Sequence, residues 1–164
     1  MIQEILKDYR LTIMGTHGLS HWGRVLETGL KLAEQTGAKP EVVTLFAVFH
    51  DARRWSEATD PGHGQRGAEL ATNLRAKFLS LSDEDFGLLS IACTHHTDGT
   101  TEGNITVQTC WDADRLDLWR VFIVPKDEFL CTPAAKDESL KHWARERSLT
   151  DYCPTFVESE WLVE

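Results

Sequence analysis

The chain contains 164 residues, of which 41% are hydrophobic and 26% are charged, and its formal net charge is −9. This length suits a single domain with one buried core, and the composition is ordinary for a globular protein. The excess of acidic residues disfavours binding of a nucleic acid polymer through a broad basic surface. No apolar run approaches the roughly 20 residues that cross a bilayer. We therefore expect neither a nucleic acid polymer nor a membrane as a partner.

The first two predicted helices lie in the N-terminal third of the chain. Apolar residues recur at spacings of three and four over 19–36, which is typical of an amphipathic helix, and Gly37 follows as a stop signal. Pro40 suits the first turn of a second helix. The apolar run VVTLFAVF at 42–49 could by itself equally be a buried strand. Pro40 and the continuation of the pattern through Arg54 favour a central buried helix.

Further helices are predicted in the middle of the chain. Apolar spacing indicates one at 65–79 and another at 107–119. Between them, Ser82 is a typical N-cap residue for a helix that ends at or just past the pair His95-His96. The chain is therefore predicted to be all-α.

The C-terminal part continues this pattern. A helical candidate at 136–147 lies between two prolines, and an acidic, aromatic tail follows at 149–164. We expect residues 1–164 to form a single helical domain, and the tail to cover that domain or to meet a partner.

Cysteine usage and the N-terminal stretch bear on the cellular compartment. Cys93, Cys110, Cys131 and Cys153 form no CxxC pair, which argues against a zinc knuckle or a thioredoxin-type motif. We interpret them as reduced thiols. The first residues lack the basic start and apolar middle of a signal peptide. A cytoplasmic location is therefore expected.

Two aspartates, Asp51 and Asp114, occur inside strongly apolar predicted helices. Burial of a carboxylate is costly unless the group is paired or bound to a metal. With His21 and His50 they form a mixed nitrogen and oxygen donor set, which suits Mn, Fe, Co, Ni or Zn, whereas an all-oxygen site would suit Mg or Ca. Adjacent helical residues point about 100° apart, so an Asp51 that reaches sideways could share a metal with His50 and bridge to a second.

Three segments resemble the signature of the HD-domain metal-dependent phosphohydrolase superfamily, which has a His on one helix, a His-Asp dyad on a later helix and a distal Asp. The matching residues are His21 in HWGRV, His50 and Asp51 in FAVFHDARR, and Asp114 in DADRLDL. The resemblance covers roughly residues 15–120, and 121–164 would form a C-terminal helix and tail. It implies an all-α, HD-type helical bundle with the metal site between central helices.

Two more segments, GHGQRGAEL at 62–70 and HHTDG at 95–99, resemble those of the binuclear members of this superfamily. The resemblance implies that His63 and His96 bind a second metal, with Asp51 as the bridge. His96 is preferred over His95 because it directly precedes Thr97, as in the family pattern.

The resemblance implies hydrolysis of a phosphate ester or anhydride in a small phosphorylated metabolite, for example a nucleotide. One or two divalent ions (Mn, Fe, Zn, Co or Ni, with Mg also open) would activate water and neutralise the phosphate. Asp51 and His50 would form the catalytic centre. By nearness in sequence, Arg53, Arg54 and Arg66 could hold phosphate oxygens.

Other interpretations stay open. Some HD-fold proteins are di-iron oxygenases, and a catalytically silent sensor of metal and nucleotide has the same signature. His17 suits a helix cap or a residue that supports a ligand, and His142 a surface position. Asp112 or Asp117 could orient a ligand histidine, or form an ordinary salt bridge with Arg115 or Arg24. A homodimer is also open.

Overall fold

The computed structural model describes residues 1–163, and every regular element in that range is a helix, which confirms the all-α prediction. The α-helices are α1 (Ile2–Leu6), α2 (Leu19–Thr36), α3 (Pro40–Phe49), α4 (His63–Phe78), α5 (Asp83–His95), α6 (Ile105–Arg115) and α7 (Glu138–Leu149). The short helices are η1 (Leu118–Val121), η2 (Asp127–Phe129), η3 (Ala134–Lys136) and the π-helical η4 (Val157–Trp161).

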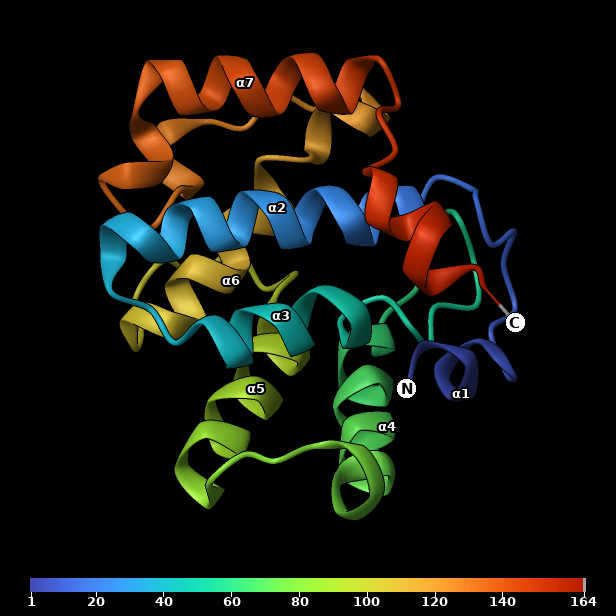
Figure 1. Ribbon diagram of the computed structural model, residues 1–164. Coiled ribbons are helices and arrows are strands. Elements are labelled where there is room, and N and C mark those ends of the chain that lie inside the picture. The colour runs from blue at the N-terminus through green and yellow to red at the C-terminus, as the bar shows by residue number, and fades with distance from the viewer. Residues whose placement is uncertain (164) are drawn as a thin grey trace.

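Helix α2 is the central element of the fold. It packs against α3 and α6 on one side and contacts α7 on the other, while α4 and α5 pack together beyond α3 (Figure 1). The helix ends where Gly37 takes the left-handed conformation, with φ of 74°, and its N–H donates to the carbonyl of Ala33 at 3.0 Å. This is the stop signal expected from the sequence.

Helix α3 is shorter than predicted, because it ends at Phe49 and does not continue through Arg54. The N–H of Ala52 donates to the carbonyl of Phe49 at 3.2 Å, and that of Arg54 to the carbonyl of Asp51 at 3.1 Å. These bonds reach back three residues instead of four, so the chain tightens into turns. Asp51 therefore lies in a turn just past the helix.

Helix α6 also ends early, at Arg115, whereas the sequence indicated a helix through 119. The N–H of Asp117 donates to the carbonyl of Asp114 at 3.0 Å, and η1 follows as a tighter helix. Ser82 caps α5 as predicted, because its side chain accepts a hydrogen bond from the N–H of Asp85.

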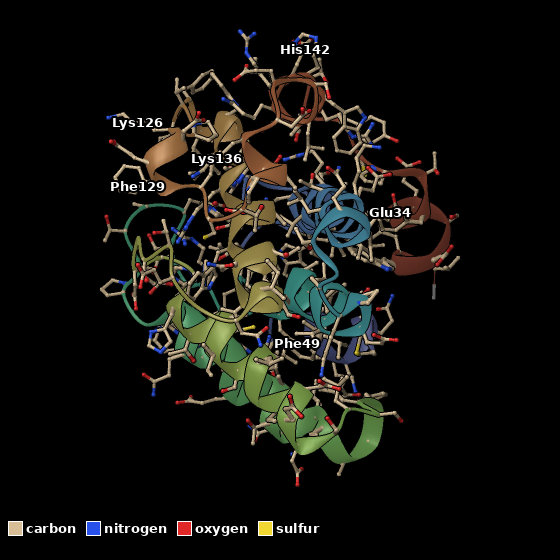
Figure 2. The ribbon with its side chains drawn as sticks, turned by 90° about the vertical axis from the view of Figure 1, so that its left-hand side faces the viewer. Glu34, Phe49, Lys126, Phe129, Lys136 and His142 are labelled. Atoms are coloured by element: carbon tan, nitrogen blue, oxygen red, sulfur yellow. The ribbon has the colours of Figure 1, made fainter. Side chains whose placement is uncertain are left out.

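One hydrophobic core joins these helices. Trp22 of α2 and Phe46 and Phe49 of α3 are its largest fully buried side chains, and Figure 2 places Phe49 among the helices. The short helix α1, which the sequence did not indicate, adds the fully buried Ile5. Among residues 1–163, no helix is both long and apolar enough to span a membrane.

The tail packs back onto the domain. Helix η4 contacts α2, and Val157 is fully buried. Over its described part the tail thus covers the domain, one of the two roles expected for it. Glu164, the last residue of that segment, lies outside the described residues.

Candidate metal centre

Six residues predicted as ligands come together between the helices. His21 comes from α2, His50 and Asp51 from the end of α3, His63 from the first residue of α4, His96 from the residue after α5, and Asp114 from α6. All six are buried, and the most exposed, Asp114, shows only 8% of its surface. Each ligand lies at or near a helix end, including His21, which is in the first turn of α2.

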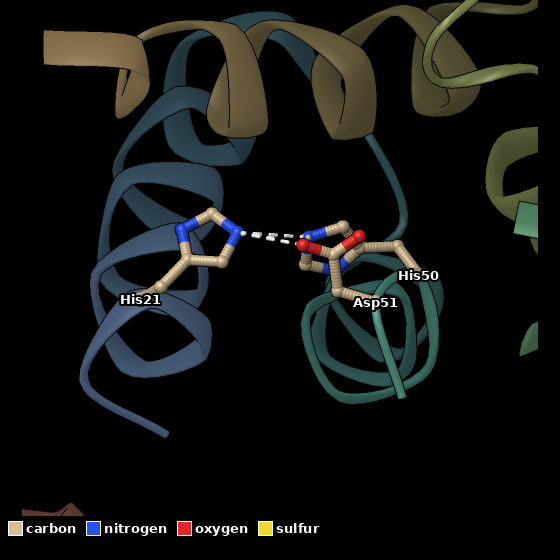
Figure 3. Close-up of side chains that lie close together, drawn as sticks. All are labelled: His21, His50 and Asp51. Atoms are coloured by element: carbon tan, nitrogen blue, oxygen red, sulfur yellow. Dashed lines mark hydrogen bonds and ion pairs between the residues drawn. The ribbon is translucent and has the colours of Figure 1, made fainter. Parts of the chain in front are cut away.

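One half of the cluster is formed by His21, His50 and one oxygen of Asp51. The two histidine Nε2 atoms lie 3.1 Å apart, and Asp51 Oδ2 is 3.6 Å from the first and 3.8 Å from the second (Figure 3). Asp114 Oδ1 lies 3.5 Å from His21 Nε2 and 3.7 Å from His50 Nε2. Two imidazole nitrogens and two carboxylate oxygens therefore converge on one point.

The other half is formed by His63, His96 and the second oxygen of Asp51. The histidine Nε2 atoms lie 3.0 Å apart, and Asp51 Oδ1 is 3.1 Å from His63 Nε2 and 3.7 Å from His96 Nε2. Each oxygen of Asp51 thus faces its own pair of imidazoles. This is the arrangement expected of a carboxylate that bridges two ions.

The remaining nitrogen of each histidine is held by an acceptor. The Nδ1 atoms of His50, His63 and His96 lie 3.1, 2.6 and 2.7 Å from backbone carbonyl oxygens of Phe46, Asp60 and Cys93. His21 Nδ1 lies 2.7 Å from Asp117 Oδ2. Since a carbonyl or carboxylate accepts, each Nδ1 carries the proton. In a neutral ring, Nε2 then offers a lone pair to the centre of the cluster.

A divalent cation fits this arrangement. Burial lowers the pKa of His21 and lowers that of His50 to about 3, so both rings are neutral near pH 7 and their lone pairs face each other. Asp51 Oδ1 is buried and has no hydrogen-bond partner in the described chain. Such a bare oxygen is costly unless a cation lies beside it. The two groups His21-His50-Asp51 and Asp51-His63-His96 each bring their ligand atoms within 4.8 Å of one another.

Asp51 is ionised in this setting. Burial alone would raise its pKa, but the neighbouring His50 ring and the contacts from His63 and His96 outweigh burial and hold the pKa well below its usual value. The carboxylate is therefore in the form that binds metals.

Asp117 orients His21 and also forms a salt bridge, so both roles considered for it occur together. Arg24 Nε donates to Asp117 Oδ1 at 2.8 Å, and Arg24 Nη2 to Oδ2 at 3.1 Å. Burial opposes the charge of Asp117, but the His21 hydrogen bond and Arg120 hold its pKa below the usual range. Asp112 instead accepts from the N–H groups of Cys131 and Thr132, at 2.7 and 2.8 Å.

The structure brings one of the predicted phosphate-binding arginines to the cluster. Arg54 Nη1 lies 3.2 Å from His63 Nε2 and 3.7 Å from Asp51 Oδ1. Arg53, its neighbour in sequence, points elsewhere, because its Nη1 donates to the carbonyl of Ile5 at 2.9 Å. The expectation of Arg53 at the site is therefore corrected. Adjacent residues in a turn project in different directions.

Arg66 is also turned away from the ligands. Its Nη2 donates to Asp60 Oδ1 at 2.7 Å, and its guanidinium lies 3.8 Å from the ring centroid of Trp55. Asp60 is the residue whose carbonyl accepts from His63. Arg66 thus stabilises the loop that holds His63. Its guanidinium does not point toward the ligands, so the phosphate contact expected for it from the sequence is corrected.

A cavity of about 330 Å³ opens beside the cluster, and Asp51, His96, Asp114 and Arg54 line it. Its wall also includes Arg120 and His17, which were not assigned there from the sequence. Arg120 Nη2 lies 4.0 Å from Asp114 Oδ1. Its position depends on η1, and no local pattern indicates it.

His17 occupies the cavity wall with its ring held on one side. Its Nδ1 contacts the carboxylate of Glu57, and its backbone carbonyl accepts hydrogen bonds from Tyr9 Oη and Trp22 Nε1, both at 2.9 Å. The sequence suggested a cap or a supporting role for this residue. In the structure the ring lies on the cavity wall itself, where the contact with Glu57 fixes its orientation.

The two remaining histidines lie away from the ligands. His95 is half exposed, and its Nδ1 lies 2.7 Å from Asp98 Oδ2. The choice of His96 over His95 therefore agrees with the geometry. His142 is exposed on α7, as Figure 2 shows, which agrees with its predicted surface position.

Comparisons with known proteins bear on the family. Neither a scan against protein-family models nor a search of curated proteins finds a match. Among solved structures, the chain is similar to the crystal structure of a predicted HD superfamily hydrolase from an uncultured Thermotogales bacterium. The two share 26% sequence identity with a TM-score of 0.65, over 98% of this chain and 88% of that one. This likeness, together with the two buried triads that share Asp51, confirms the resemblance to the HD superfamily that the sequence indicated.

Proposed function

We propose that this protein is a metal-dependent phosphohydrolase that cleaves a phosphate ester or phosphoanhydride bond in a small phosphorylated metabolite, for example a nucleotide. The observation that carries the proposal is the position of Asp51. Its two oxygens each face a pair of imidazole Nε2 atoms, beside a cavity lined by two arginines. The likeness to a predicted HD superfamily hydrolase supports it.

The ligand set divides into two ion sites. One would be held by His21, His50, Asp51 and Asp114, and the other by Asp51, His63 and His96. Mixed imidazole and carboxylate donors suit Mn, Fe, Zn, Co or Ni, and Mg stays open as an alternative. When bound, such ions supply a water nucleophile near neutral pH and neutralise charge on the phosphate.

Arg54 and Arg120 bind the phosphate oxygens in this proposal. Both lie on the wall of the 330 Å³ cavity that contains Asp51 and Asp114. A guanidinium forms short, charge-assisted hydrogen bonds with phosphate, often in pairs. Arg54 would hold the phosphate on the His63 side, and Arg120 on the Asp114 side. Together they place positive charge at the phosphate in a chain whose net charge is −9.

His17 acts as a proton acceptor on the wall of the same cavity in this proposal. The contact of its Nδ1 with Glu57 fixes the ring, and the described chain offers Nε2 no hydrogen-bond partner. Burial lowers the pKa of His17, so near pH 7 the ring is neutral with its proton on Nδ1, and Nε2 can accept a proton from a water at the cavity. The ring thus combines a fixed orientation with a free nitrogen at the cavity.

The test is phosphate release by the purified protein from a panel of phosphate monoesters and nucleotides, with and without added Mn²⁺, Fe²⁺ or Zn²⁺. We expect metal-dependent release that Asp51→Asn abolishes. A metal-loaded protein that releases no phosphate from any compound would contradict the proposal. In that case, oxygen consumption with two irons per chain would indicate an oxygenase, and binding without turnover would indicate a sensor.

A cytoplasmic location and a homodimer remain predictions from the sequence. So does the assignment of residues 1–164 to a single HD domain.

A further inference from the structure

A second cavity, of about 380 Å³, adjoins the cavity of the arginines. Both are lined by His96, Thr97, Asp114, Leu118 and Ile123, so they meet at the metal ligands. We call the second cavity the apolar lobe, after the side chains on its wall: Leu118, Ile123, Val124, Pro125, Phe129 and Leu130. A molecule bound at Asp114 can therefore extend from one cavity into the other.

Hydrogen bonds and core packing fix the walls of the apolar lobe. Arg115 Nη1 donates to the carbonyl of Phe129 at 2.7 Å and Arg115 Nη2 to that of Thr100 at 2.8 Å, so one buried side chain joins two sides of the lobe. The carboxylate of Asp112 holds the N–H of Cys131 at 2.7 Å, just past the wall. Leu130 is 1% exposed and anchors the wall in the core. The lobe thus stays open without a ligand, which favours binding.

The outer wall exposes large apolar side chains beside the site. Ile123, Val124 and Phe129 are 52%, 57% and 48% exposed. Figure 2 shows Phe129 near the edge of the molecule with Lys126 beside it. Apolar surface that lines a cavity next to a polar site is typical of the part of a pocket that holds the organic portion of a ligand.

Charged groups around the lobe are already paired or lie at its rim. Arg115 is engaged by two carbonyls and by Cys131 Sγ at 3.3 Å. Lys126 Nζ lies 3.5 Å from Glu128 Oε1, and the Lys126 side chain is 68% exposed. Within residues 1–163, the charges that face the ligand thus belong to the arginine cavity and the metal ligands. The lobe itself suits an uncharged group.

We propose that the apolar lobe binds the uncharged, apolar organic group of a phosphate ester, an aryl ring or branched alkyl chain, while the phosphate lies at Asp51 between Arg54 and Arg120. This inference rests on the proposed phosphohydrolase function and narrows its substrate class. Transfer of an apolar ring from water into the lobe stabilises the complex, whereas a charged or strongly polar group would lose its hydration without a partner.

The experiment compares two phosphonates that share the anionic group and have no ester bond to cleave. Benzylphosphonate and methylphosphonate are titrated into the Mn²⁺-loaded protein in a calorimeter. We expect benzylphosphonate to bind about tenfold more tightly or better, from burial of its ring. In Val124→Asp the ratio of the two affinities should fall close to one, because the new carboxylate lies at the lobe. The ratio cancels long-range repulsion, which acts on both ligands.

A matched control is Ile91→Asp, which places the same charge on α5 at a residue of similar exposure, 49%. It should keep the wild-type ratio. Uridine monophosphate is titrated in the same way as a polar ligand. Three results would overturn the apolar lobe as the subsite: benzylphosphonate that binds no more tightly than methylphosphonate, no binding of either phosphonate, or uridine monophosphate that binds more tightly than benzylphosphonate. Failure of the proposed function is distinguishable, because the benzyl preference would then persist in a protein that releases no phosphate.

Discussion

Gly64 of α4 lies directly against His96, the residue that follows α5. A Cβ atom at Gly64 would lie 3.0 Å from His96 Nδ1 and 2.2 Å from the carbonyl oxygen of Cys93, which is the acceptor for that nitrogen. The two helices therefore approach without an intervening side chain. This close contact allows His63, the neighbour of Gly64, to bring its Nε2 atom within 3.0 Å of His96 Nε2.

Gly64→Ala should damage the second metal site. The methyl group collides with backbone, so α4 must shift away from α5, at a cost of about 1–3 kcal/mol in the free energy of unfolding. Elemental analysis should show loss of one metal equivalent. The control is Gly87→Ala in α5, where a Cβ meets nothing within 4 Å. That variant should be more stable by about 0.5–1 kcal/mol and keep all its metal. Equal metal content in both variants would contradict the prediction.

Asp117→Asn should weaken metal binding without removing a ligand. The amide keeps the size of the side chain but not the charge that holds the His21 Nδ1 proton and Arg24. Loss of such an orienting partner lowers metal affinity roughly 10–100-fold, measured by competition with a chelator. Asp151→Asn is the control. The native Asp151 contacts the same Arg24 at 3.0 Å, but its side chain is 77% exposed. If both variants bind metal alike, Asp117 does not orient His21.

Arg54 and Arg53 form a matched pair for the phosphate contact. Arg54→Gln should lower kcat/KM for phosphate release about tenfold to a hundredfold, because a hydrogen bond to a charged group is lost at the cavity. Arg53→Gln should change kcat/KM by no more than about twofold, since Arg53 binds the carbonyl of Ile5 instead. Circular dichroism checks that both variants fold. A larger loss in Arg53→Gln than in Arg54→Gln would reverse the assignment.

The sequence was informative where a local pattern marks a residue. His50 and Asp51 are adjacent, and His21 and Asp114 lie in short segments that resemble family motifs, so the candidate ligands could be named before their distances were known. The order of the helices followed from apolar spacing. The end of α3 did not, because residues 50–54 contain no glycine or proline to mark where the helix stops.

Residues that reach the site through tertiary structure could not be predicted. Arg120 lines the cavity because η1 follows α6, and His17 because Glu57 lies beside it across 40 positions of sequence. The apolar lobe depends on Phe122, whose φ of 60° turns the chain back after η1. A phenylalanine in this left-handed conformation is unusual, and no sequence signal indicated it.

Protonation of His50 should make the metal-free protein less stable in acid. Burial lowers its pKa from 6.5 to about 3 in the folded state, so between these values the unfolded chain binds more protons. The stabilising effect of the neutral ring is complete above pH 6.5 and declines as the pH falls toward 3. From pH 7 to pH 5 the loss is about 2 kcal/mol.

The contribution of His50 to the free energy of unfolding can be separated from those of other titrating groups. Wild type and His50→Gln are compared in urea unfolding at pH 7 and pH 5. The His96 pKa is raised, because contacts with Asp51 outweigh burial, so His96 acts in the opposite direction in both proteins. The variant should lose less stability between the two pH values. An equal loss in both proteins would show that His50 is not buried as a neutral ring.

The most direct test of the two-metal site is elemental analysis of freshly purified wild type beside His96→Ala and Asp51→Ala. We expect up to two transition-metal equivalents per chain in wild type, one fewer in His96→Ala, and almost none in Asp51→Ala, which lacks the carboxylate that faces both histidine pairs. Wild-type protein that binds no metal under any loading condition, or Asp51→Ala with an unchanged metal content, would contradict the assignment of this cluster as a metal centre.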